Sequence, residues 1–275
     1  MRFSLLRLVI AAGFALLLIA SQSVQAASFD VGCSTTELVA AINTANGDSD
    51  PDTLNLAANC VYSFTTGDID NNDSALPRIT TSITINGNHA IIERASDAAG
   101  NFRLIYIASG TNVALKTLTI RGGMSAVDGG GILNVGNLTV INSAIIGNHS
   151  PFNGGGIYNQ INATMINTIV SGNHAGSHGG GVYNGIGSLS VINSTIAGNN
   201  NIDSGGLYNE GGNLTIFNSI LWGNSTQITS NGGSVNTAYS VIEGGGYDGT
   251  GNLDVDPLFI DAIPYASAPT TGGDY

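Results

Sequence analysis

The chain has 275 residues, of which 42% are hydrophobic and 9% charged, with seven Lys and Arg against 19 Asp and Glu. This acidic balance disfavours nucleic acid and anionic lipid surfaces as partners. Because charge is sparse, solubility must depend on Asn, Ser, Thr and exposed glycine amides, and the length suits one elongated domain.

Residues 1–26 are typical of a secretory signal peptide. Arg2 and Arg7 give a positive start, an apolar run follows over Leu8–Ala20, and small residues precede a cleavage site after Ala26. An uncleaved anchor is the weaker alternative, because the run is short for a membrane span of roughly 20 residues. We therefore expect a secreted or cell-surface protein with net charge −14 (five cations against 19 acids) after cleavage and no transmembrane helix in the mature chain.

Residues 27–112 are predicted to form an N-terminal cap and irregular first coils. Cys33 and Cys60 are the only cysteines, and an even pair in an exported protein indicates one disulfide, although spacing alone does not establish it. Between them, residues 35–46 have a helical apolar face, with Thr35 or Thr36 as the cap. A short helix there would cover the open end of the first coil. Early strands are expected over residues 53–57, 82–92 and 102–108.

Residues 113–239 repeat one short motif with a step of 25 residues. Each copy combines Asn-Ser-x-Ile-x-Gly-Asn with Gly-Gly-Gly-Ile-Tyr-Asn, and a fixed period of this size predicts a solenoid. Apolar, largely β-branched residues two positions apart indicate strands rather than helices. Each copy is therefore expected to form about three short strands separated by Asn and Gly turns. The closing asparagines of the copies are Asn134, Asn159, Asn184 and Asn209.

One copy alone cannot bury its apolar side chains, whereas stacked copies align them in continuous columns. Successive strands would then pair in parallel at about 4.8 Å, and corner asparagines would bond the coil above. The sequence thus predicts an all-β, single-stranded parallel β-helix, right-handed by analogy with known solenoids, with a short N-terminal capping helix. A disordered linker would have no reason to keep these columns in register. Among the inward residues are Leu138, Ala163, Leu189, Leu214, Ile157 and Val182.

Residues 240–275 form an irregular C-terminal segment in which no repeat survives. Residues 258–260 (Leu-Phe-Ile) are expected to cover the last coil. Asp254, Asp256 and Asp261 suggest a calcium loop, but Pro257 and the lack of further oxygen ligands disfavour it. The abrupt end at Tyr275, without an anchor, is what a fragment of a longer protein would show.

The repeat resembles those of polymorphic outer membrane proteins. It is more similar still to bacterial secreted choice-of-anchor surface proteins, in which Asp-Pro-Leu-Phe, here residues 256–259, also occurs near the end of the array. Residues 33–46 are similar to their N-terminal cap. The resemblance covers most of the mature chain and implies a right-handed parallel β-helix at the cell surface, but little about activity. The family's C-terminal anchor is missing from this sequence.

The sequence predicts no catalytic residues and no cofactor. Polysaccharide lyases of this shape use a cation and calcium-binding carboxylates, whereas residues 122–275 contain neither Lys nor Arg. Hydrolases need paired carboxylates roughly 5–9.5 Å apart, and we place Asp128, Asp203 and Glu210 in different columns. A structural, adhesive or glycan-binding role is therefore expected, with a polysaccharide lyase or hydrolase as the alternative.

Tyr158, Tyr183 and Tyr208 are the candidate ligand-binding residues. Each follows an inward apolar residue, so strand alternation points it outward and stacks it on the next copy. Such an exposed aromatic stripe can bind sugar rings or a partner protein. The alternative is a stacking ladder that stabilises the array by about 0.5–1.5 kcal/mol per pair. The expected partner is a cell-surface glycan or another surface protein.

His149 and His174 occupy the same position in adjacent copies. They could share a metal ion, but Asn199 is expected to break the column and no carboxylate joins it, so solvated loop residues are favoured and no metal is predicted. Six Asn-x-Ser/Thr sequences arise from the repeat itself and need not indicate glycosylation. They begin at Asn137, Asn148, Asn162, Asn193, Asn213 and Asn224.

Overall fold

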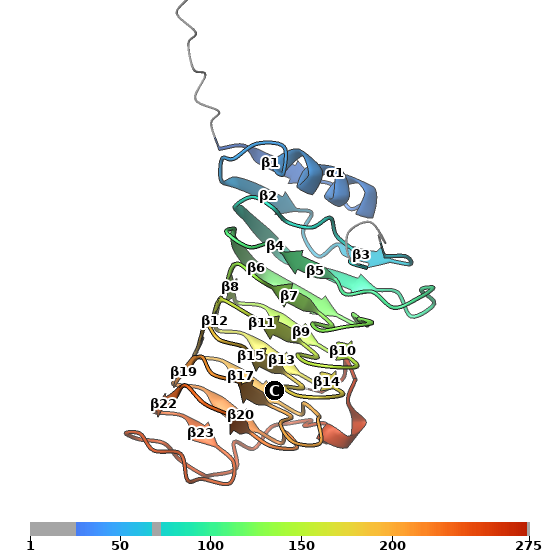
Figure 1. The fold of residues 1–275 in the computed structure, drawn as a ribbon. Helices are drawn as coiled ribbons and strands as arrows, with labels where there is room; N and C mark the ends of the chain where they lie inside the picture. The colour runs from blue at the N-terminus through green and yellow to red at the C-terminus, as the bar shows by residue number, and fades with distance from the viewer. Residues whose placement is uncertain (1–25, 68–72, 274–275) are drawn as a thin grey trace, which may run out of the picture.

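The structure, a computed structural model, describes residues 26–67 and 73–273 and shows a right-handed parallel β-helix of about 8 turns (Figure 1). The predicted fold class is confirmed. The expected signal peptide falls, apart from Ala26, outside the described residues and stays a prediction. Within residues 26–67 and 73–273, no helix is long and apolar enough to cross a bilayer.

Each regular turn contributes strands to three faces of the solenoid. The first face comprises β1 (Ser28–Val31), β2 (Asp52–Leu56), the starts of β4 (Ile83–Arg94) and β6 (Asn112–Arg121), β8 (Asn137–Ile141), β12 (Asn162–Ile166), β16 (Ser188–Ile192), β19 (Asn213–Phe217) and β22 (Ser234–Ala238). The second face comprises β3 (Val61–Phe64), the ends of β4 and β6, β9 (Ala144–Ile146), β13 (Ile169–Ser171), β17 (Thr195–Ala197), β20 (Ile220–Trp222) and β23 (Val241–Ile242). The third face comprises β5 (Ile105–Ile107), β7 (Ile132–Asn134), β11 (Ile157–Asn159), β15 (Val182–Asn184), β18 (Leu207–Asn209) and β21 (Ile228–Ser230). The remaining elements are α1 (Thr35–Ala45), the short pair β10 (His149–Ser150) and β14 (His174–Ala175), and the 3-10 turn η2 (Tyr265–Ser267).

The apolar columns form the core as predicted. Leu138 of β8 pairs in parallel register with Ala163 of β12, and Ile157 of β11 pairs with Val182 of β15. Leu138, Ile157 and Val182 are at most 2% exposed. Because every inward side chain rests on a similar one in the next turn, burial continues along the whole array.

The corner between the first and second faces needs a left-handed residue in each turn. Asn142 and Asn167 adopt φ 50°, a conformation that Asn tolerates better than most residues. Their exposed amides also stack, since Asn167 Nδ2 donates to Asn142 Oδ1 at 3.0 Å. The predicted bonding between corner asparagines is thus present here.

A buried asparagine ladder runs just inside the next corner, between the second and third faces. Its members are Asn148, Asn173, Asn199 and Asn224, none more than 4% exposed. Asn173 shows the pattern: its Oδ1 accepts from the backbone N (2.9 Å) and Nδ2 (3.0 Å) of Asn148, and its Nδ2 donates to Ile145 O and Asn199 Oδ1, both at 2.9 Å. The four bonds use the amide's full capacity, which is what a buried amide requires.

A second buried ladder closes the third face, where each turn passes to the next. Nδ2 of each residue donates to Oδ1 of the next at 2.7 Å, and all are fully buried. The members are Asn134, Asn159, Asn184 and Asn209. The repeat's most regular polar residues are therefore interior, and they tie successive turns together.

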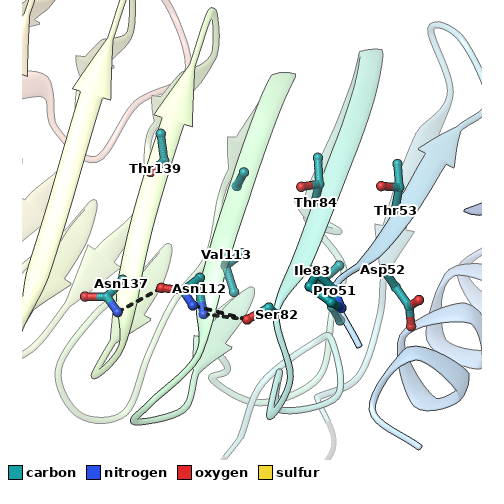
Figure 2. Close-up of a pocket in the computed structure, with 11 residues that line it drawn as sticks. Pro51, Asp52, Thr53, Ser82, Ile83, Thr84, Asn112, Val113, Asn137 and Thr139 are labelled. Carbon is teal, nitrogen blue, oxygen red and sulfur yellow. Dashed lines mark hydrogen bonds between the residues drawn. The ribbon is translucent and has the colours of Figure 1, made fainter. Parts of the chain in front are cut away.

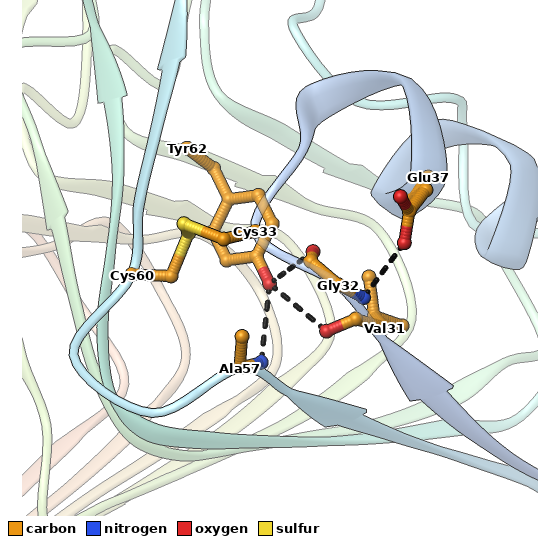
Figure 3. The surroundings of a disulfide bond; sticks show 7 residues. All are labelled: Val31, Gly32, Cys33, Glu37, Ala57, Cys60 and Tyr62. Atoms are coloured by element: carbon orange, nitrogen blue, oxygen red, sulfur yellow. Dashed lines mark hydrogen bonds between the residues drawn. A yellow bond between two sulfur atoms is a disulfide. The ribbon is translucent and has the colours of Figure 1, made fainter.

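The N-terminal cap matches its prediction in outline (Figures 1 and 3). Cys33 and Cys60 are disulfide-bonded with Cα atoms 5.5 Å apart, beside the buried Tyr62. Leu38 and Ile42 of α1 are buried over the first coil. The cap residue was predicted wrongly: it is Ser34 rather than Thr35 or Thr36, and its side chain makes no capping bond.

The predicted C-terminal cover is wrong. Leu258 and Ile260 are 79% and 90% exposed, because the chain leaves the axis before them and returns along the side of the array (Figure 1, red). Tyr247 packs on the core instead, and Asn252 Nδ2 donates to Thr237 Oγ1 at 2.8 Å. The returning tail bonds through Thr270 N to the carbonyl of Gly172 at 2.9 Å.

Asn173→Ala should lower the free energy of unfolding by roughly 2–4 kcal/mol, because it leaves buried donors and acceptors without partners. The matched control is Asn162→Ala in the same turn, whose exposed amide donates to Asn137 Oδ1 at 2.8 Å and whose loss should cost under about 1 kcal/mol. Urea unfolding followed by circular dichroism measures both. Equal losses would contradict the assigned role of the buried ladder.

Candidate functional site

The three predicted tyrosines form one in-register column on the third face. The Tyr158 and Tyr183 ring centroids lie 4.9 Å apart with planes 6° from parallel, and those of Tyr183 and Tyr208 lie 5.4 Å apart at 15°. Leu133 precedes the column and Thr229 follows it. Centroid separations of this size are typical of stacked rings that attract one another.

Exposure along the tyrosine column differs from the prediction. Tyr158 and Tyr183 are half-buried, but Tyr208 is only 7% exposed, because the His178 ring lies 4.3 Å from its centroid. Since Tyr183 has a tyrosine ring on either side, it presents its edge and hydroxyl to solvent rather than a face. The predicted stripe is present, but a sugar ring cannot stack on Tyr183 because both faces of that ring are covered. Ligand binding by the stripe stays a prediction.

Polar side chains flank the tyrosine column. Tyr158 Oη donates to Gln160 Oε1 at 2.8 Å, and in the same position two turns on, Glu210 lies beside Tyr208 and accepts from Asn231 Nδ2 at 3.3 Å. Gly185 occupies the position between Gln160 and Glu210. One side of the stripe thus offers an amide beside Tyr158 and a carboxylate beside Tyr208, with no side chain beside Tyr183.

A second polar column lies on the other side of the tyrosines. Its members show that the predicted placement of the acidic residues was wrong. Asp128 and Asp203 were assigned to different columns, but they share one, separated by Asn153 and His178. Asn153 N donates to Asp128 Oδ1 at 2.9 Å, and His178 Nδ1 lies 3.2 Å from Asn153 Oδ1. Because the carboxylates are three turns apart, about 14 Å at strand spacing, they cannot act as a hydrolase pair.

The phenol groups are held in their neutral form. Burial raises the pKa of Tyr183, and the nearby negative charge of Glu210 raises it further. Burial also raises the pKa of Tyr158 and of Tyr208, and a hydrogen bond to Glu210 adds to the rise at Tyr208. At neutral pH the column therefore presents hydroxyl groups and no phenolate.

His149 and His174 lie next to each other, as predicted, but they are not simply solvated. They pair in register between β10 and β14 and are half-buried, with their Nδ1 atoms 3.0 Å apart. Burial lowers the pKa of both imidazoles, and the charge of His174 lowers that of His149 further. Asn200, not Asn199, continues the column; Asn199 belongs to the buried ladder.

The calcium loop suggested for Asp254, Asp256 and Asp261 does not assemble. Asp254 Oδ1 accepts from Gly244 N at 3.1 Å, and Asp256 Oδ1 accepts from Leu258 N at 2.8 Å. Across residues 26–67 and 73–273, no three or more His, Cys, Asp or Glu side chains cluster as a metal site would require. These aspartates therefore shape the local backbone.

Two arginines lie at the edge of a groove on the second face that the sequence analysis did not predict. Arg94 and Arg121 border a groove of about 410 Å³ on the second face, together with Glu93 and Thr271 of the returning tail. Arg121 forms an ion pair with Glu93 at 2.7 Å, and Arg94 Nη2 donates to the carbonyls of Ala98 and Gly100. Both arginines thus have structural partners. Their positions at the ends of two neighbouring long strands are the sequence feature that could have predicted this pair.

Another groove, of about 420 Å³, crosses the outer surface of the first face (Figure 2). Thr53, Thr84 and Thr139 lie along it in the outward positions of their strands, and Ala114 stands between the last two. An exposed amide ladder forms its lower edge: Asn137 Nδ2 donates to Asn112 Oδ1 at 3.0 Å. This surface offers hydroxyl and amide groups but few charges.

The structure separates the six glycosylation sequences into two groups. Asn148 and Asn224 belong to the buried ladder, so their amides are inaccessible in the folded protein. The others have partly or fully exposed side chains. They are Asn137, Asn162, Asn193 and Asn213.

Fold and repeat together define a parallel β-helix repeat protein with one N-terminal disulfide. Comparison with protein-family models, with curated proteins and with solved structures found no match to this chain.

The raised pKa of Tyr158, Tyr183 and Tyr208 predicts alkaline instability. A tyrosine in the unfolded chain ionises near its ordinary value of 10.0, whereas these remain neutral in the folded state. The folded state's advantage is complete below pH 10 and is lost as pH rises above it, because only the unfolded chain then releases protons readily. Melting of wild type and Tyr158→Phe/Tyr183→Phe between pH 8 and 11 should show a smaller alkaline loss in the variant. Parallel losses would contradict this.

Proposed function

We propose that this chain is a secreted or cell-surface β-helix that binds a linear, uncharged glycan on its third face without cleaving it. The observation that carries the proposal is the row of half-exposed Tyr158 and Tyr183 edges, one turn apart, beside Gln160 and Glu210. A polymer with a short repeat is a natural ligand for a surface with a short repeat.

The side chains on this face fit sugar hydroxyl groups. Phenol and amide groups both donate and accept hydrogen bonds, and carboxylates accept them. The neighbouring carboxylates of Asp128 and Glu210 would repel a polyuronate, which favours a neutral glycan. Because the ring of Tyr183 is covered on both faces, recognition would rest on hydroxyl groups and ring edges rather than on stacking.

Export is supported by two independent features. The N-terminal sequence is typical of a signal peptide, and the Cys33–Cys60 disulfide suits an oxidising compartment. The fold alone is compatible with a surface protein or a carbohydrate-active enzyme. Binding is favoured over cleavage because the column acids stand too far apart and the arginines have structural partners.

Replacing Tyr158 and Tyr183 by Phe tests the role directly, because it removes the hydroxyls while keeping the stacked rings. We expect roughly 30-fold weaker retention on insoluble neutral glycans such as chitin or cellulose, at about 1 kcal/mol for each of the two lost hydrogen bonds, with unchanged melting at pH 7. The control is Thr139→Val/Thr164→Val on the first face, which should bind normally.

Unchanged retention by the tyrosine variant would refute binding on the third face. Loss confined to the threonine variant would place the glycan on the first face instead. Release of soluble sugar from any retained glycan would favour the enzyme alternative.

A further inference from the structure

A column of four potential metal-binding side chains follows the corner next to the second face. Met124, His149, His174 and Asn200 occupy equivalent positions on consecutive turns, joined by parallel bridges. All four are partly exposed, while the residues after them, Ser125, Ser150, Ala175 and Asn201, are buried. Strand alternation therefore directs the four side chains outward on the same side, about 4.8 Å apart.

The two imidazoles converge through one nitrogen each. The Nδ1 atoms of His149 and His174 lie 3.0 Å apart, whereas the ring centroids lie 5.0 Å apart with planes 17° from parallel. One Nδ1 must carry a proton and the other a lone pair for this contact to be a hydrogen bond. A metal ion in place of that proton would meet both lone pairs after a small widening, since metal–imidazole bonds are about 2 Å long.

The character of the neighbouring ligands selects the metal. Met124 contributes a thioether, a soft donor that prefers copper(I), and imidazole also suits copper. None of the four side chains in this column is a carboxylate, so a monovalent soft ion costs less to hold there than a hard divalent one. The protein's formal net charge of −12 attracts cations generally.

We propose that Met124, His149 and His174 form a binding site for one copper(I) ion, with Asn200 beside it. The site lies away from the tyrosine column and does not depend on the proposed glycan binding.

The test is an anaerobic titration of the full chain with copper(I) against the chromophoric chelator bicinchoninate. We expect one equivalent to bind, and binding to be lost in His149→Phe/His174→Phe, which keeps two rings in place. Melting and circular dichroism check that this variant folds. The matched control is His89→Asn, which removes an exposed histidine outside the column and should bind copper normally.

Met124→Leu tests the thioether separately. It should weaken copper(I) binding at least about tenfold and remove a sulfur scatterer from the copper X-ray absorption spectrum. The loss assigns that sulfur to Met124, because the variant keeps Met1, the buried Met165 and both disulfide-bonded cysteines. The proposal is overturned if the wild type binds no copper(I), if the double histidine variant still binds it, or if Met124→Leu binds unchanged.

Discussion

The structure depends on amide groups that are buried rather than exposed. Asn173, Asn199 and Asn224 each place a fully hydrogen-bonded side chain inside the solenoid, where an unpaired amide would cost about 1–3 kcal/mol. Apolar columns favour stacking of the turns, but apolar side chains of similar size would also tolerate a shift of one strand along its neighbour. An amide that must meet the amide of the next turn does not, so the ladders fix the register that every surface column inherits.

That register converts a repeat in sequence into sites in space. Side chains 25 residues apart, such as Tyr158 and Tyr183, become neighbours about one strand spacing apart. Columns on the third face collect phenol and amide groups, and the column that passes through β10 and β14 contains two imidazoles. Each column presents a different kind of side chain through the same stacking, and each extends only as far as the repeat keeps the same residue type.

The sequence predicted the β-helix, the inward columns, the capping helix and the disulfide, because period and alternation are local signals. It did not distinguish Asn148, which is buried, from Asn142, which is exposed. Both asparagines lie at turns of the repeat, and their sequence surroundings do not show which side chain points into the solenoid. Counting in fixed steps also failed locally: the step from His174 to its partner is 26 residues, so Asn200 rather than Asn199 continues that column. The prediction that residues 258–260 cover the last coil was wrong, because no local sequence pattern shows where a chain leaves the solenoid axis.

Hydrogen exchange of asparagine side-chain amides, resolved by NMR, tests the central claim most directly. The carboxamide protons of Asn148, Asn173 and Asn199 should exchange at least about tenfold more slowly than those of Asn137 and Asn162 on the outer surface, because they are released only when turns separate. Equal exchange rates in the two groups would show that the interior amides are open to water and would contradict the account.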